Sequence, residues 1–75
     1  MRELIEYIAK SLVDAPENVK IRQIEGEQSI ILELTVAPTD MGKIIGRQGR
    51  VAKAMRTLLK VAAAREGKRA ILEIV

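Results

Sequence analysis

The spacing of hydrophobic residues changes along the first half of the chain. The first apolar residues recur at the period of one helix face, and since Pro16 cannot continue a helix, a helix is predicted from residue 2 to residue 14 or 15. Apolar and polar residues then alternate over residues 19–36 around a turn at 25–28, which predicts a β-hairpin. Ile24 breaks the alternation and indicates a bulge or a strand end. The apolar stripe of the helix consists of Leu4, Ile5, Ile8, Ala9, Leu12 and Val13.

A short helix is predicted between the hairpin and the glycine at position 46. Its first N–H groups can be capped by the side chain of Thr39 or Asp40. Gly46 ends the helix, because glycine readily adopts the left-handed backbone found at helix ends. The spacing of three apolar residues places them together on its core-facing side, and these are Met41, Ile44 and Ile45.

A long amphipathic helix is predicted over residues 50–65, and a last strand over residues 70–75. Gly67 lies just past the helix, where glycine commonly ends one. The predicted core stripe of the helix is Val51, Ala54, Met55, Leu58, Leu59 and Ala62. Beside it lies a flank of small and apolar residues that is either the edge of the core or a dimer contact, namely Thr57, Val61 and Ala64.

The 75 residues are expected to form a single α+β domain, with the order helix, strand, strand, helix, helix, strand. The hairpin makes the first two strands antiparallel, and a right-handed crossover through the two later helices makes the third strand parallel to the second. The result is a three-stranded mixed sheet with three helices packed on one face. Its other face is bare or covered by a partner, and would carry Lys20, Arg22, Ile31, Glu33, Ile71 and Val75.

The loop between the last two helices combines two glycines with positive charge. Gly46 and Gly49 bracket Arg47 and Gln48, and Arg50 follows. Without side chains at the glycines, a foreign backbone can approach closely, and the N–H groups at a helix start favour an anion such as phosphate. An ordinary connector at a tight corner is the alternative, but it does not need two glycines three residues apart with an arginine between them.

Positive charge is concentrated around this loop. Residues 43–69 hold nine Lys or Arg and one acid, whereas residues 1–42 hold four bases and eight acids, although the whole chain carries only +3. Such a division is typical of a surface that binds a polyanion. A helix solvated by basic residues remains the alternative explanation.

Several classes of function are disfavoured by composition. The chain has no Cys and no His, which removes the usual ligands for zinc and the usual groups for nucleophilic or acid–base catalysis. The ten carboxylates lie mostly on predicted solvated faces, so we expect no enzyme, no metal, no cofactor and no small-molecule substrate. Gly42 and Lys43 do not complete a P-loop, because Ala37 stands where the pattern requires glycine. No apolar run is long enough to span a membrane, so a cytoplasmic protein is expected.

The segment Ile45-Gly46-Arg47-Gln48-Gly49 resembles the I-G-x-x-G signature of KH domains, and the predicted order of elements is similar to their prokaryotic type II topology. Over its whole length, including LVDAPENV, VAPTDMGKIIGRQGRVAKAMRTLL and AAAREGKRAILEIV, the chain resembles the KhpA family of small bacterial single-KH proteins. The resemblance implies binding of single-stranded RNA, with the loop clamping about four nucleotides of backbone.

Site residues follow from the resemblance position by position. The loop glycines would meet phosphates, Arg47 and Gln48 would project into the RNA, and the groove floor would come from the two helices and the second strand. Ile44 would touch bases, whereas Ile45 would belong to the core. The expected RNA-binding residues are Lys43, Ile44, Gly46, Arg47, Gln48, Gly49, Arg50 and Lys53.

The chain has one tyrosine, Tyr7, which is expected to pack on the rim of the core.

An interaction module is the competing function. The resemblance implies homodimers and pairing with a larger KhpB (Jag) protein, and a role in post-transcriptional regulation or RNA chaperoning linked to cell elongation and division. In this alternative the domain mainly binds another protein and RNA affinity is secondary. The flank at Thr57, Val61 and Ala64 is the expected dimer surface, because it is apolar on an otherwise basic helix.

Overall fold

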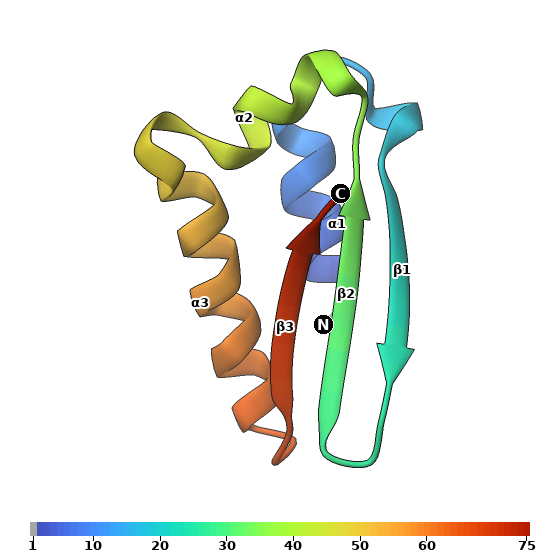
Figure 1. Cartoon of the computed structure of the whole chain (residues 1–75), viewed down its shortest axis with the longest axis vertical. Coiled ribbons are helices and arrows are strands. Elements are labelled where there is room, and N and C mark those ends of the chain that lie inside the picture. Colours follow the sequence, from blue (N-terminus) through green and yellow to red (C-terminus); the bar gives the residue numbers. More distant parts are fainter. Residues whose placement is uncertain (1) are drawn as a thin grey trace.

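The computed structural model describes residues 2–75, which form helices and strands in the predicted order (Figure 1). Short 3-10 turns at Pro16–Asn18, Pro38–Asp40 and Arg47–Gly49 connect the longer elements. The longer elements are α1 (Arg2–Leu12), β1 (Lys20–Glu25), β2 (Ser29–Thr35), α2 (Met41–Ile45), α3 (Arg50–Ala64) and β3 (Arg69–Ile74).

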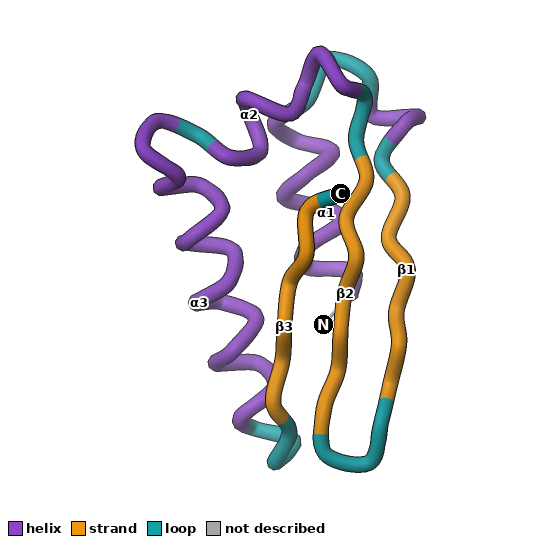
Figure 2. The backbone as a smooth tube through the Cα atoms, in the orientation of Figure 1, coloured by secondary structure: helices purple, strands orange, loops and turns teal. Residues whose placement is uncertain are grey.

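The strands of the described chain form one mixed sheet with β2 in the centre (Figure 2). As predicted, β1 pairs with β2 antiparallel and β3 pairs with β2 parallel. The bulge predicted at Ile24 is wrong, because Ile24 pairs with Ile31 in an unbroken register. Ile24 instead lies on the same face as Lys20 and Arg22 and is 41% exposed, so an apolar residue occupies the solvent side of a regular strand.

The helices cover one face of the sheet, and α3 runs alongside β3 (Figure 1). This arrangement confirms the α+β class and the type II KH topology that the resemblance implied. Side chains from all six longer elements meet in one core, which buries Ile5, Ala9, Ile21, Ile30, Leu32, Leu34, Ile44, Met55, Leu59 and Leu72. The alternating residues of β2 contribute its centre, as the sequence predicted.

The buried stripes on the helices are narrower than the apolar stripes in the sequence. Ile5 and Ala9 of α1 are fully buried, but Leu4 and Leu12 are 38% and 39% exposed. The expectation that Tyr7 packs its ring on the core is wrong, because this side chain is 73% exposed. In so small a domain a helix buries only the residues that point directly at the sheet.

Asp40 connects the end of α1 to the start of α2. It occupies the position before α2, as predicted, but its side chain makes no capping hydrogen bond to that helix. The buried carboxylate instead accepts hydrogen bonds from the backbone N–H groups of Asp14 and Ala15, both at 3.1 Å. This contact spans 26 residues of sequence and fixes the position of α2, and therefore of the loop that follows it.

The other face of the sheet carries the residues predicted for it and is not covered by any described part of the chain. Ile71 and Val75 are 49% and 56% exposed there. Arg22 and Glu33, neighbours in the β1–β2 register, form an exposed ion pair at 3.6 Å. Ionic and apolar side chains are thus mixed on this face.

Candidate nucleic-acid interface

Gly46 ends α2 in a backbone conformation that only glycine adopts readily. Its φ and ψ are 76° and 173°. A Cβ built at this position would lie 2.4 Å from Cγ2 of Val51 and 2.9 Å from the backbone nitrogen of Val51. Gly46 therefore lets the end of α2 pack directly against the first turn of α3, and the sharp corner between the helices depends on it.

The second half of the loop is also left-handed, and one of its residues is not glycine. Gln48 has a φ of 58° and Gly49 a φ of 73°. A left-handed conformation costs a residue such as glutamine about 1 kcal/mol, and such conformations are often found at functional sites. No pattern in the sequence predicts this strain, and the side chain of Gln48 is exposed at the tip of the loop.

Two backbone N–H groups at the tip of the loop lack protein partners. Those of Gly49 and Arg50 donate to the carbonyls of Gly46 and Arg47, so these two are not available to a ligand. Within residues 2–75, the N–H groups of Arg47 and Gln48 donate to no backbone carbonyl. Neighbouring free N–H groups beside a left-handed residue form a concavity that suits an anion.

Two arginines of the loop, at positions 47 and 50, carry positive charge close to these N–H groups in the sequence. Arg47 and Arg50 are both exposed, and neither forms an ion pair with an acid among the described residues. The guanidinium of Arg50 donates to Oε1 of Gln48 at 3.4 Å, so it lies over the tip of the loop. The structure thus brings together the predicted residues from position 46 to position 50.

The roles expected for the two isoleucines are reversed. Ile44 is fully buried in the core, so it cannot touch bases, whereas Ile45 is 41% exposed directly before the loop. The short α2 rotates by about 100° per residue, and its phase places Ile44 toward the sheet. Ile45 is therefore the aliphatic surface available beside the glycines.

Lys43 is held by acids within the protein. Its ammonium group donates to the Asp14 carboxylate and lies 3.8 Å from Oδ1 of the buried Asp40. The hydrogen bond with Asp14 raises the pKa of Lys43. Lys43 thus joins the contact between α1 and α2, and its charge is partly neutralised before any ligand arrives.

The strand that lies beside α3 is β3 and not β2. The expectation that β2 floors the groove is wrong, because β2 is central and its helix-facing residues Ile30, Leu32 and Leu34 are buried. At the edge of β3, Nε of Arg56 donates to the backbone carbonyl of Leu72 at 3.4 Å. The strand edge that lies beside α3 is therefore that of β3.

Helix α3 exposes two chemically different sides. Positions 53, 56 and 60 fall within one third of the helix circumference, next to β3, and form what we call the cationic side, Lys53, Arg56 and Lys60. Further round the helix lies the apolar side, Ala54, Leu58 and Val61, although Ala54 and Leu58 were predicted in the core stripe. Leu58 and Val61 are 45% and 52% exposed. Thr57 and Ala64, from the predicted dimer flank, are exposed between the two sides.

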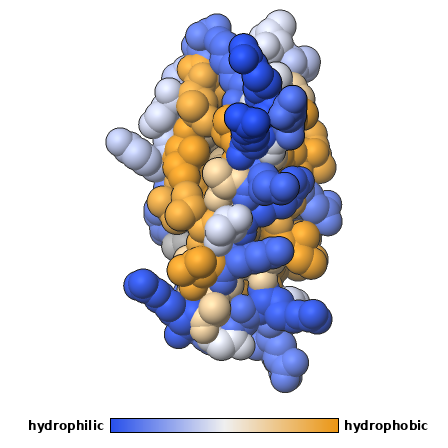
Figure 3. All heavy atoms as spheres, turned by 90° about the vertical axis from the view of Figure 1, so that its left-hand side faces the viewer, coloured by the Kyte–Doolittle hydropathy of each residue, from blue (hydrophilic) through white to orange (hydrophobic). Residues whose placement is uncertain are grey.

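The apolar side is part of a shallow groove. A space of about 500 Å³ lies against Arg50, Lys53, Ala54, Thr57 and Leu58. Figure 3 faces the left-hand side of Figure 1, where α3 lies, and shows hydrophobic and hydrophilic residues gathered in separate areas. A ligand that bridges both areas would meet charge on one margin and aliphatic surface on the other.

Two further features, a cluster of metal ligands and a membrane-spanning helix, are absent from residues 2–75. Nowhere in residues 2–75 do three or more acidic side chains gather as ligands for a metal ion. None of the helices in the same range has the length and apolar composition needed to cross a membrane.

Comparison with known proteins relates nearly the whole chain to one family. Residues 2–74 match the family model described as "KhpA/KhpB, KH domain". The chain is 61% identical over 75 residues to the RNA-binding protein KhpA of Clostridium acetobutylicum and 60% identical to that of Clostridium perfringens, with all of each chain covered. It is 44% identical to the RNA-binding protein KhpA of Aquifex aeolicus, covering 95% of that protein. No solved structure matches the chain.

Proposed function

The chain belongs to the KhpA/KhpB KH-domain family, and we propose that it binds single-stranded RNA by clamping the backbone with the loop at residues 46–49. The observation that carries this proposal is the pair of unpartnered N–H groups at Arg47 and Gln48, held outward by a strained backbone. A phosphate that accepts both would sit between two unpaired arginines. RNA-binding relatives of the same length support the choice of ligand.

The rest of the groove supports an RNA strand that leaves the loop along α3. Lys53 and Arg56 follow Arg50 down the side of the helix nearest β3, where their charges can meet successive phosphates. Ile45 offers aliphatic surface to a base, in place of Ile44. A single groove for about four nucleotides, with few donors for base edges, selects weakly among sequences, so sequence preference is expected to be slight.

The test replaces both side chains at the tip of the loop. Arg47→Asp with Gln48→Asp should lower the affinity for a fluorescent oligouridylate by about 100-fold or more, since two carboxylates would face a phosphate. Aspartate tolerates the left-handed backbone at position 48 better than glutamine does, so the loop should keep its shape. Fluorescence anisotropy measures the affinity, and circular dichroism checks the fold.

A matched control keeps the charge change but moves it to the opposite edge of the sheet. Lys20→Asp with Arg22→Gln lowers the net charge by three units, as the loop variant does, and Lys20→Asp with Glu27→Lys rearranges charge without changing the net charge. Both should bind within threefold of the wild type at 0.15 M salt, because exposed charges beyond about 8 Å are screened. Undiminished binding by the loop variant, with a native spectrum, would rule out the clamp.

A second function is supported by the apolar side of α3. We propose that Leu58 and Val61, with the neighbouring Thr57 and Ala64, form a contact with a second copy or with the KH domain of a KhpB (Jag)-type protein. Apolar residues on an otherwise charged helix are the usual core of such contacts. In this proposal the protein acts in post-transcriptional regulation or as an RNA chaperone in the cytoplasm, with the partner adding RNA contacts.

A further inference from the structure

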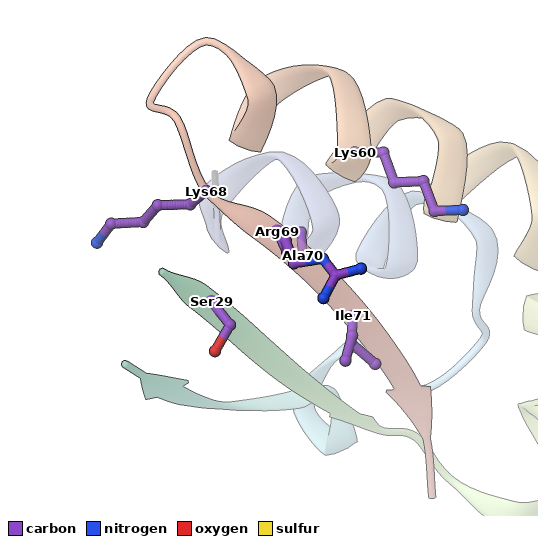
Figure 4. Close-up of a pocket in the computed structure, with 6 residues that line it drawn as sticks. All are labelled: Ser29, Lys60, Lys68, Arg69, Ala70 and Ile71. Carbon is purple, nitrogen blue, oxygen red and sulfur yellow. The ribbon is translucent and has the colours of Figure 1, made fainter. Parts of the chain in front are cut away.

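A second group of cations lies at the far end of α3 from the glycine loop. An open pocket of about 650 Å³ is bounded by α3, the start of β2 and the start of β3 (Figure 4). Lys60 is ten residues along α3 from Arg50, which places it about 15 Å from the start of the helix. The pocket is lined by Ser29, Lys60, Lys68, Arg69, Ala70 and Ile71.

The cations of this pocket are not equivalent. Lys68 is paired with Oε2 of Glu25 at 2.5 Å, and this hydrogen bond lowers the pKa of Glu25. Lys60 and Arg69 form no ion pair with any acid in the described chain. In Figure 4 the side chains of Lys60 and Arg69 extend toward the same side of β3, while that of Lys68 extends the opposite way. Two uncompensated charges from separate elements therefore face one space.

The lining also offers groups suited to the neutral parts of a nucleotide. Ile71 is 49% exposed and presents aliphatic surface next to Arg69 on the same face of β3. Ser29 is the neighbour of Arg69 in the β2–β3 register, and its hydroxyl can donate or accept a hydrogen bond. A phosphate bound by Lys60 and Arg69 would thus have a sugar or base within reach of Ile71 and Ser29.

Continuity with the glycine loop decides the ligand. Lys60 is the last residue of the cationic side, so Lys53, Arg56 and Lys60 connect the loop to the pocket without an intervening acid on that side of α3. We infer that the pocket holds a phosphate of the same RNA strand that the loop clamps, several nucleotides away, so that the two ends of α3 grip one strand. This inference rests on the proposed function. It extends the RNA contact to Lys60 and Arg69, neither of which belongs to the loop.

Strand length provides the first test. Amide spectra of ¹⁵N-labelled protein are recorded with oligouridylates of three and of ten nucleotides. The trinucleotide should shift the amide signals of the loop, and the decanucleotide should also shift those of Ser29, Arg69 and Ile71. Shifts that stop at the loop with the longer RNA would overturn the inference. Equal shifts at both places with the trinucleotide would also overturn it, because the pocket would then be a separate anion site.

Charge reversal provides the second test. Lys60→Glu with Arg69→Glu should lower affinity for the decanucleotide at least tenfold and reduce the slope of log affinity against log salt by about 1.4, the value for two lost contacts to a single strand. Lys20→Glu with Arg22→Glu is the control, with the same change in net charge on β1. An equal loss in the control, or no loss in the Lys60 and Arg69 variant, would contradict the inference.

The two proposals fail in different ways. If the loop variant Arg47→Asp with Gln48→Asp loses RNA and the Lys60 and Arg69 variant does not, the pocket alone is excluded. If the pocket variant loses RNA and the loop variant does not, the clamp at the loop is excluded. If the wild-type protein binds neither oligonucleotide, both are excluded.

Discussion

The cationic and apolar sides of α3 belong to one helix but differ in their surroundings. The cationic side starts at the glycine loop and borders β3, where Arg56 reaches the carbonyl of Leu72. The apolar side faces away from the described chain, with Leu58 and Val61 about half exposed. The two sets of residues meet at the groove lined by Lys53, Ala54 and Leu58, but Arg56 and Lys60 are separated from Val61 around the helix, so a ligand on the former need not displace a ligand on the latter.

This separation also avoids an electrostatic cost. A protein partner that covered Lys53 or Lys60 would have to remove a charge from water, which costs several kcal/mol without a paired acid. A partner that covers Leu58 and Val61 instead removes apolar surface from water, which is favourable. One helix of 15 residues can thus serve an RNA strand and a protein partner at the same time.

The largest effect on stability is expected at Gly46, which forms the corner between α2 and α3. Gly46→Ala should lower the free energy of unfolding by about 2–4 kcal/mol, because the new Cβ would clash with Val51 in a conformation that alanine adopts poorly. Relieving this clash requires the first turn of α3 to move, and the cationic side then moves relative to the loop. Urea unfolding followed by circular dichroism measures the loss.

Gly49→Ala is the matched variant, since it lies in the same loop and also has a positive φ. A Cβ at Gly49 would meet nothing within 4 Å, so only the backbone cost of about 1–2 kcal/mol is expected. Equal losses at the two glycines would show that the contact with Val51 does not hold the corner.

The apolar side is tested by a charge placed at its centre. Val61→Lys should weaken self-association or KhpB-type pairing at least tenfold, because a buried ammonium without a partner is costly. Affinity for a trinucleotide at the loop should stay within twofold of the wild type. Sedimentation analysis at several protein concentrations gives the mass, and anisotropy gives the RNA affinity.

Val75→Lys controls for the added charge. Val75 is 56% exposed, similar to Val61 at 52%, but it follows β3 and lies away from α3. This variant should keep the wild-type mass. A mass unchanged by Val61→Lys, or changed equally by both substitutions, would remove the apolar side of α3 as the contact surface.

The regular elements could be predicted because their signals are local and repeated. The alternation in β2 extends over seven residues and has only one phase that buries Ile30, Leu32 and Leu34 together. The two glycines and the arginines identified the loop for the same reason, since they are adjacent in sequence. Type II topology then followed from the order of the elements and the hand of the crossover.

The wrong predictions concern features that depend on distant parts of the chain, namely which face of a helix points to the core and which groups a side chain hydrogen-bonds to. The five residues of α2 complete little more than one turn, so the sequence could not decide whether Ile44 or Ile45 faces the core. In α3, small residues lie on several sides, and Ala52 and Ala63 rather than Ala54 and Leu58 are buried. Asp40 looked like a helix cap, but its partners at positions 14 and 15 lie 26 and 25 residues earlier in the chain, before β1.

Lys43 decides how far the cationic surface extends beyond α3, and it gives the smallest expected effect. Asp14→Asn removes the hydrogen-bonded carboxylate that holds the Lys43 ammonium. Since exposed ion pairs contribute little in water, releasing Lys43 should raise RNA affinity only about twofold. Asp40 remains 3.8 Å away and keeps the side chain near α2. Anisotropy titrations at low salt measure the change.

Glu17→Gln is the control, because it removes one negative charge from a neighbouring exposed residue that forms no ion pair within the described chain. Both variants change the net charge equally and so have a similar effect on the overall electrostatic field. They differ only in the release of Lys43. The pKa of Lys43 is raised above its ordinary value in the folded protein, so its pairing is complete below about pH 10 and lost only as the pH rises further. The difference between the two variants should therefore be the same at pH 6.5 and pH 8. An equal gain in both variants would mean that Lys43 contributes only to the contact between α1 and α2.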